Sequence, residues 1–198
     1  MARTEEIPEI RPIEHLFKKF EHSVVVAAGP NAKDDLDLFF KKHAHQFGTV
    51  VKPIIGVNHH ADFHLIETDF NCFLDWPTDQ TPEEFDIMAS TPGKRVSIHE
   101  QWTDWEMKYK LNWVDRGETA MMAVWFASFI TIGNVYLCGF DCWQNTEKSH
   151  FYKDRPEERK RLNGKPKRQK ERWRELLLLC DNPKRIIPMS GILTEIEL

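Results

Sequence analysis

The chain has 198 residues, of which 41% are hydrophobic and 29% are charged, and its formal net charge at pH 7 is −4. This length and balance predict one globular domain over residues 1–198 and give no global reason to expect nucleic-acid binding. The sequence has neither the roughly 18 apolar residues of a membrane span nor the apolar segment of a signal peptide. Because no two of the four cysteines form a Cys-x-x-Cys pair, we expect reduced thiols and a cytoplasmic protein.

The first half of the chain alternates apolar runs with amphipathic segments. A helix is predicted over residues 13–20, followed by a buried strand over 24–28, because five apolar residues are too few for a buried helix. After a Gly-Pro-Asn turn, residues 32–47 have the apolar spacing of an amphipathic helix. Strand-like runs follow at 49–58 and 70–76.

The second half continues this alternation. A Thr-Pro pair followed by acidic residues opens a predicted helix at 81–90, and a short strand is expected at 95–100. The most apolar helix candidate covers 118–133 and leads into a second buried strand at 134–141. The last predicted elements are a basic helical region at 155–179 and a strand at 185–190. The pattern predicts an α/β fold with a Rossmann-like, mostly parallel sheet and helices on both faces.

The residues just past the predicted strands are the ones that such a sheet offers for chemistry, because the carboxyl ends of parallel strands meet at one edge. These candidate binding residues are Gly29, Pro30, Asn31, Asn58, His59, Asp75, Gly139 and Asp141, joined by Thr119 at the start of the apolar helix. Backbone N–H groups there suit phosphate, while amide and carboxylate side chains suit a base and a ribose.

The Gly-Pro-Asn turn after the first strand has two interpretations. Gly29 allows a ligand to approach the main chain, and Asn31 can cap the following helix or donate to an oxygen. A purely structural turn is an equal alternative, because the match to phosphate-loop templates is partial.

Several stretches together carry a resemblance to known families. They read VVVAAGPN, GVNHHADF, FLDW, RGETAMMAVWFASFITIGNVYLCGFDCWQN and RIIPMSGILTEI, and their order fits from about Ser23 onward. The chain resembles the bacterial sialyltransferase family that includes the Campylobacter lipooligosaccharide enzymes. It is also similar to a related Rossmann-like family that includes archaeal pterin pyrophosphokinases. The resemblance implies a nucleotide-sugar-binding fold that works without a metal or another cofactor.

The resemblance also implies roles for individual residues. Gly29 and Asn31 match the family's Gly-Pro-Ser turn near the donor phosphate, and Asn58 matches an Asn that contacts the nucleotide. Asp141 matches the acid after the penultimate strand, and Thr119 falls on the hydroxyl position of a Thr-Ser-Gly helix start. Ser190 and Leu193 match part of the family's C-terminal Pro-Asn-Ser-x-Leu segment.

A glycosyl transfer needs a base for the acceptor's proton and stabilisation of the departing phosphate. His150 follows the Asp141 strand and is the candidate base, although a surface histidine is the alternative interpretation. Tyr152, Lys153 and Arg155 are candidates for neutralising the phosphate. The sequence therefore predicts a metal-independent glycosyltransferase that uses a nucleotide-sugar donor. The alternatives are another nucleotide-dependent transferase, such as a pyrophosphokinase, and a non-catalytic nucleotide- or nucleic-acid-binding protein.

A His-rich stretch and an acidic stretch are each candidates for a metal-binding site. The stretch NHHADFH gathers His59, His60, Asp62 and His64, which is a ligand set for zinc. Because adjacent residues of a strand point to opposite faces, we expect a nucleotide-side or structural role instead. The Asp-Leu-Asp stretch at 35–37 imitates a metal-binding motif of glycosyltransferases, but it lies on a predicted helix, which favours a solvated helix face.

The basic residues gather in a lid-like segment at about 144–178. Such a segment either attracts a polyanion or is a charged helix face, and the expected acceptor is a saccharide or a hydroxylated DNA base. Trp102, Trp105 and Trp113 either form an acceptor platform or pack their loop against the body. The sequence leaves open whether the chain forms a homo-oligomer.

Overall fold

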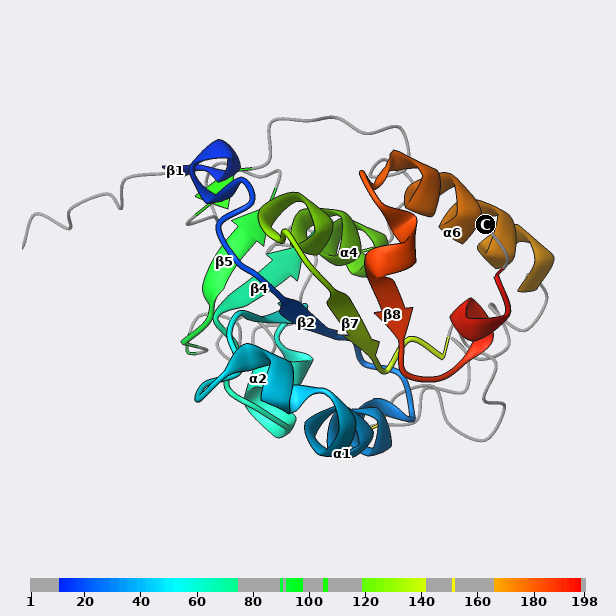
Figure 1. Cartoon of the computed structure of the whole chain (residues 1–198), viewed down its shortest axis with the longest axis horizontal. Helices are drawn as coiled ribbons and strands as arrows, with labels where there is room; N and C mark the ends of the chain where they lie inside the picture. The colour runs from blue at the N-terminus through cyan, green and yellow to red at the C-terminus, as the bar shows by residue number, and fades with distance from the viewer. Residues whose placement is uncertain are drawn as a thin grey trace, which may run out of the picture.

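The computed structural model describes residues 11–74, 90, 92–97, 105–106, 119–141, 151 and 166–196. Within these ranges, one parallel sheet has the strand order β1-β6-β5-β4-β3-β2-β7-β8 (Figure 1). The strands are β1 (Arg11–Pro12), β2 (Ser23–Val26), β3 (Ile54–Val57), β4 (Phe70–Phe73), β5 (Lys94–Ser97), β6 (Trp105–Glu106), β7 (Val135–Cys138) and β8 (Ile186–Pro188). The predicted α/β fold with a parallel sheet is confirmed.

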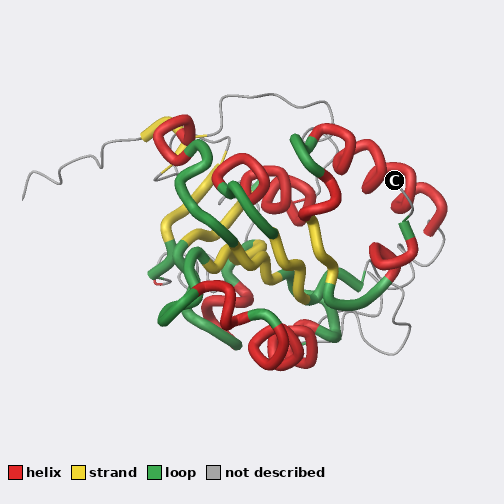
Figure 2. Tube along the Cα trace, viewed as in Figure 1, coloured by secondary structure: helices red, strands yellow, loops and turns green. Residues whose placement is uncertain are grey.

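Helices cover both faces of the sheet (Figures 1 and 2). The described α-helices are α1 (Ala32–Lys42), α2 (His60–His64), α4 (Thr119–Ile130) and α6 (Pro166–Leu179). The described 3-10 helices are η1 (Ile13–Leu16), η2 (Ala44–Phe47), η6 (Pro183–Arg185) and η7 (Ile192–Glu195). Helices α1 and α2 lie on one face, and α4 and α6 lie on the other. None of the helices in the described ranges is long and apolar enough to cross a membrane.

The core has two parts because side chains of a strand alternate between the faces of the sheet. On one face, Val24 and Tyr136 pack with Phe39 of α1, and all three side chains are fully buried. On the other face, Val25 packs with α4, whose Phe126 is also fully buried. Helix α4 is apolar nearly all round because it lies between the sheet and α6.

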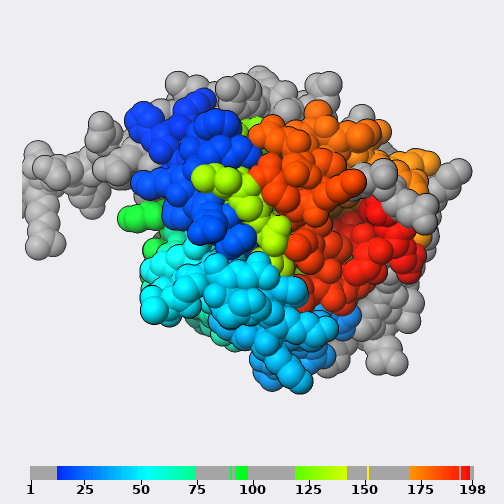
Figure 3. Space-filling view, in the orientation of Figure 1, coloured from blue at the N-terminus to red at the C-terminus, as the bar shows by residue number. Residues whose placement is uncertain are grey.

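The described segments from both ends of the chain meet around β7. Strand β8 pairs with β7 on one side, and β2 pairs with it on the other. Figure 3 shows this arrangement on one face, where early residues in blue and C-terminal residues in orange to red flank the yellow-green β7 region. Three segments far apart in sequence are therefore neighbours at this side of the sheet.

The helix predicted over 13–20 is shorter than expected. Only Ile13–Leu16 is helical, as the 3-10 helix η1, and Lys18 takes a left-handed backbone conformation with φ of 48°. A continuing helix is excluded there because the right-handed form needs a negative φ. The helix predicted at 81–90 lies almost entirely outside the described residues, as does the part of the basic helix before Pro166.

Lys18, two residues after η1, joins this part of the chain to the C-terminal end of α4. Its ammonium donates to the carbonyl oxygens of Ser128 at 3.3 Å and Thr131 at 3.2 Å, and it lies 2.9 Å from the Asp181 carboxylate. A cation at this end of a helix satisfies free carbonyls and complements the dipole. We expect Lys18→Ala to lower the free energy of unfolding by about 1–2 kcal/mol. Urea denaturation beside the exposed control Lys19→Ala measures the effect, and equal losses in the two variants would contradict it.

Candidate functional site

The strand order reverses beside β2. From β2 the chain passes through α1 to β3 and then outward to β4, β5 and β6, and after α4 it returns to β7 on the opposite side of β2. Open parallel sheets bind ligands in the crevice outside the carboxyl ends of the two strands where the order reverses. Because Val26 pairs with Cys138, β2 and β7 end at the same level. The segments that follow them are Gly29–Asn31 and Gly139–Asp141.

These two segments are in direct contact. The Gly29 N–H donates to the Gly139 carbonyl oxygen at 3.0 Å, and the Asn31 N–H donates to Asp141 Oδ2 at 3.0 Å. A Cβ at position 29 would lie 2.3 Å from Asp141 Oδ2 and 2.3 Å from the Gly139 carbonyl oxygen. The structure thus brings together four predicted binding residues, which are Gly29, Asn31, Gly139 and Asp141. Pro30 lies between the first two in the sequence. We use the word crevice for the region outside the carboxyl ends of β2 and β7, where this contact lies.

Of the two interpretations of the turn, the structural one agrees with its hydrogen bonds. The Gly29 and Asn31 N–H groups, expected to face phosphate, donate to oxygens of the protein itself. Position 29 is glycine because Gly139 and Asp141 approach it closely. Asn31 stands at the N-cap position of α1, but its side chain makes no capping hydrogen bond there.

Asp35 is the functional candidate that the sequence analysis missed. It was expected on a solvated helix face, but it is 3% exposed, whereas Asp37 is exposed. Its Oδ2 accepts hydrogen bonds from the Gly139 N–H at 2.8 Å and from the Ser190 hydroxyl at 2.9 Å. The signal was in the helical spacing, since Ala32, Asp35, Leu36 and Phe39 are the buried residues of α1 and share one face.

Asp35 and Asp141 form a pair of buried carboxyl groups beside the crevice. Burial raises the pKa of Asp35, the Gly139 and Ser190 hydrogen bonds partly offset this, and the charge of Asp141 raises it further. Burial also raises the pKa of Asp141, and the Asn31 N–H opposes that rise. Buried acids with raised pKa values at a cleft mark candidate functional sites.

Asn58 and His59 lie at the same edge of the sheet, at the end of the next strand. They follow β3, the other neighbour of β2, so they lie on the edge that carries the Gly29–Asn31 turn. Asn58 takes a left-handed conformation with φ of 58°, which asparagine tolerates better than most residues, and its N–H donates to the Cys72 carbonyl oxygen at 2.9 Å. His59 is 4% exposed and stands just before α2.

The His-rich stretch is a helix, so the expectation of alternating strand faces is wrong. The ring centroids of His59 and His60 lie 4.2 Å apart, and those of His60 and His64 lie 6.4 Å apart. Asp62 instead accepts hydrogen bonds from the Thr68 and Gly93 N–H groups and from the Asn71 side-chain amide. Among the described residues, no group of three His, Cys, Asp or Glu is arranged to hold a metal ion.

One described residue of the predicted lid-like segment lies at the end of β2. The Phe151 N–H donates to the Ala28 carbonyl oxygen at 3.2 Å, and its ring contacts His64 with centroids 6.0 Å apart. Thr119 begins α4 and is 8% exposed. The predicted site residues that lie outside the described ranges are Asp75, His150, Tyr152, Lys153 and Arg155.

No protein-family model, curated protein or solved structure matches the chain. The resemblance to sialyltransferases therefore stays a prediction. The positions on which it depends do gather in part: Gly29, Asn31 and Asp141 are in contact, and Ser190 bonds to Asp35 next to them. Leu193 is buried in the core on the α4 face of the sheet.

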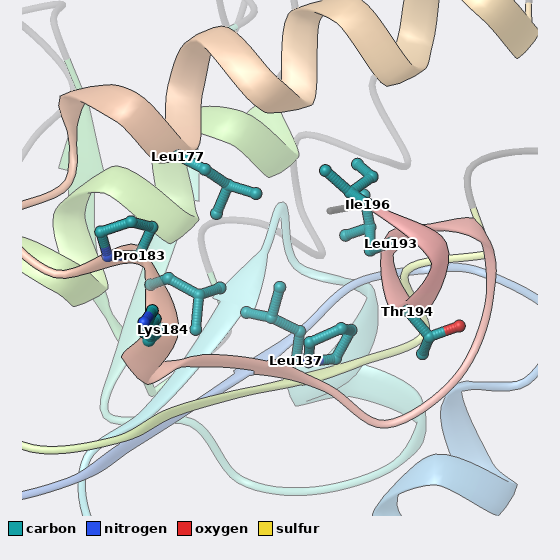
Figure 4. Close-up of a pocket in the computed structure, with 9 residues that line it drawn as sticks. Leu137, Leu177, Pro183, Lys184, Leu193, Thr194 and Ile196 are labelled. Carbon is teal, nitrogen blue, oxygen red and sulfur yellow. The ribbon is translucent and has the colours of Figure 1, made fainter. Parts of the chain in front are cut away.

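A separate pocket of about 330 Å³ lies among α6, β7, β8 and η7 (Figure 4). Its lining is Leu137, Leu177, Pro183, Lys184, Ile186, Pro188, Leu193, Thr194 and Ile196. This lining is mostly apolar, and apart from Leu193 it contains none of the residues singled out in the sequence. The crevice is the stronger candidate site because polar groups from several strand ends converge there.

Proposed function

We propose that this protein transfers a sugar from a nucleotide-sugar donor to an acceptor hydroxyl and binds the donor in the crevice between β2 and β7. The observation that carries the proposal is the contact of Gly29–Asn31 with Gly139–Asp141 where the strand order reverses. Parallel α/β sheets bind nucleotides at this position. The resemblance supports the same place, because three residues that it assigns to the donor are in contact there.

The polar groups at the crevice favour one orientation of the donor. Asn31 and Asn58 are partly exposed, and their side-chain amides suit the base and the ribose. The backbone N–H groups of the turn already bond to protein oxygens, and two carboxylates lie beside them. Because like charges repel, the hydroxyl-bearing part of the donor lies nearest the turn and the phosphate lies farther from it.

The remaining predicted residues have roles in the transfer step itself. The acceptor oxygen bonds to the sugar, the bond from the sugar to the phosphate oxygen breaks, and the nucleotide leaves with the electron pair. In the proposal His150 takes the acceptor's proton, and Tyr152, Lys153 and Arg155 neutralise the leaving phosphate. These four residues lie outside the described ranges, so their roles depend on the sequence alone.

A second candidate function is transfer of a pyrophosphoryl group with Mg²⁺. One observation favours it: Asp35 and Asp141 place two carboxylates together, and Mg²⁺ prefers oxygen ligands. The Oδ2 atoms of both residues already accept N–H hydrogen bonds, which favours the metal-independent proposal.

We expect a screen of nucleotides and nucleotide sugars by thermal shift to find a stabilising ligand. A ligand at 100 times its Kd adds about 2.7 kcal/mol to the free energy of unfolding. Turnover of the donor that it identifies is expected to continue in EDTA. Turnover that EDTA abolishes and Mg²⁺ restores would favour the second candidate, and binding without any turnover would favour a non-catalytic protein.

A further inference from the structure

The pocket shown in Figure 4 has no role in the proposed transfer. Its volume is about 330 Å³, and it lies beside the core on the α4 face of the sheet, to which Leu137, Leu177, Ile186 and Leu193 of its lining belong. Concave, mostly apolar sites of this size are where proteins bind small molecules. The pocket therefore has the dimensions of a second binding site.

Apolar side chains form most of the described lining. Leu177 of α6, Leu137 of β7 and Leu193 of η7 lie around one space, together with Ile196 just after η7 (Figure 4). Each methylene group that leaves water for such surroundings strengthens binding about fourfold. An alkyl chain suits this part of the pocket.

The described lining has two polar residues, Lys184 and Thr194. The Thr194 hydroxyl donates to the Gly191 carbonyl oxygen at 2.7 Å, so its hydrogen is already in use. Lys184 is exposed and forms no ion pair with any residue that the structure describes. Its ammonium can therefore donate to a polar group at the end of a ligand.

The acidic residues that stand closest to this lining in the sequence already have cations. The Asp181 carboxylate lies 2.9 Å from the Lys18 ammonium, and the Glu195 carboxylate lies 2.9 Å from that of Lys170. Lys184 thus keeps its charge for an added anion. One ammonium group complements one negative charge, which is the charge of a carboxylate.

We propose that this pocket binds a medium-chain fatty acid, with its alkyl chain among the apolar side chains and its carboxylate paired with Lys184. The volume sets the chain length. At about 30 Å³ for each water-sized group, the pocket holds about eleven non-hydrogen atoms, the size of an acid with roughly eight to ten carbons. This site is separate from the crevice, and the inference does not depend on the proposed function.

Titration of the full chain with octanoate, followed by amide NMR, tests the location. Saturable shifts are expected at Leu177, Lys184 and Leu193, whereas Gly29 and Gly139 at the crevice should not respond. The absence of a saturable shift at the pocket lining would overturn the proposal.

A series of acids of different length tests the fit to the pocket. Hexanoate, which is two methylene groups shorter, should bind roughly tenfold more weakly than octanoate. Hexadecanoate should bind no more tightly than decanoate, because its additional carbons stay outside the pocket. An affinity that keeps rising up to hexadecanoate would indicate non-specific binding and would overturn the proposal.

A charge variant tests the role of Lys184. By calorimetry, Lys184→Gln is expected to bind octanoate about fivefold more weakly than the wild type, because an exposed ion pair is lost. Its affinity for the uncharged octan-1-ol should stay unchanged. The matched control is Lys33→Gln, since Lys33 is an exposed lysine of α1 on the other face of the sheet, and this variant should bind octanoate like the wild type. Equal affinities of Lys184→Gln and the wild type for octanoate would contradict the pairing.

A variant that fills the pocket gives a test that does not depend on charge. Ile196 is partly buried in the lining, so Ile196→Phe adds volume there without entering the fully buried core. This variant should bind both octanoate and octan-1-ol at least about tenfold more weakly than the wild type. Unchanged binding in a folded Ile196→Phe would place the ligand elsewhere and overturn the proposal. Should this variant fail to fold, the substitution at the exposed Lys184 still decides.

Discussion

Gly29→Ala is expected to lower the free energy of unfolding by about 3 kcal/mol. The added methyl group would lie 2.3 Å from both Asp141 Oδ2 and the Gly139 carbonyl oxygen, far inside contact distance. Neither atom can move away easily, because Asp141 is bonded to Asn31 and Gly139 is held by Asp35. Urea denaturation followed by circular dichroism measures the loss.

A control variant separates this clash from backbone strain. Gly48 has a positive φ of 73°, but a Cβ there would meet nothing within 4 Å. Gly48→Ala is therefore expected to lose only about 1 kcal/mol, from strain alone. If Gly29→Ala were as stable as the wild type, the close contact of the two segments would be refuted.

The same variant is expected to weaken ligand binding. A methyl group at position 29 would push Asp141 and Gly139 away from the turn, and these residues lie where the donor is proposed to bind. At a temperature where the variant stays folded, its affinity for the nucleotide donor should fall at least about tenfold, which corresponds to 1.4 kcal/mol. Affinity unchanged from the wild type would mean that the donor binds elsewhere.

Asp62→Ala is the second substitution with a large expected effect, again a loss of about 3 kcal/mol. Its carboxylate accepts three hydrogen bonds at 2.9–3.0 Å, from the Thr68 and Gly93 N–H groups and the Asn71 amide. Asn71 is fully buried, so its amide would be left without this acceptor in the variant. The loss would free α2 from the segments that lead into β4 and β5.

Chemical denaturation beside Glu67→Ala tests this prediction. Glu67 is exposed three residues beyond α2, so its removal should change stability by less than about 0.5 kcal/mol. Equal stability of the two variants would show that Asp62 is not the acceptor that secures α2. Zinc added to the wild type is expected to leave its thermal midpoint unchanged, since Asp62 is already occupied by three donors.

The strand-turn-helix unit around Gly29 was predictable because its signals are local. A run of buried β-branched residues stops at Gly-Pro, and the next segment repeats apolar residues at helical spacing, which fixes β2 and α1. The edge strand β1 and its neighbour β6 have two residues each, too few for any periodic pattern. Their pairing depends on neighbours in space.

The wrong predictions for Asp35 and for the His-rich stretch have a common physical cause. Asp35 was interpreted as part of a solvated helix face because it lies on a predicted helix, whereas its hydrogen-bond donors, Gly139 and Ser190, lie more than 100 residues away. The His-rich stretch has no clear period of its own, and Asp62 fixes it through contacts with β4 and the approach to β5. Buried polar groups take their roles from distant partners, which no local pattern reveals.

The central claim is that a nucleotide donor binds where β2, β7 and β3 end, and amide NMR mapping tests it most directly. Titration with the nucleotide found by thermal shift is expected to give saturable shifts that cluster at Gly29, Asn31, Asn58 and Gly139. Shifts confined to the apolar pocket around Leu177 and Leu193, or no saturable shift with any nucleotide or nucleotide sugar, would contradict the account.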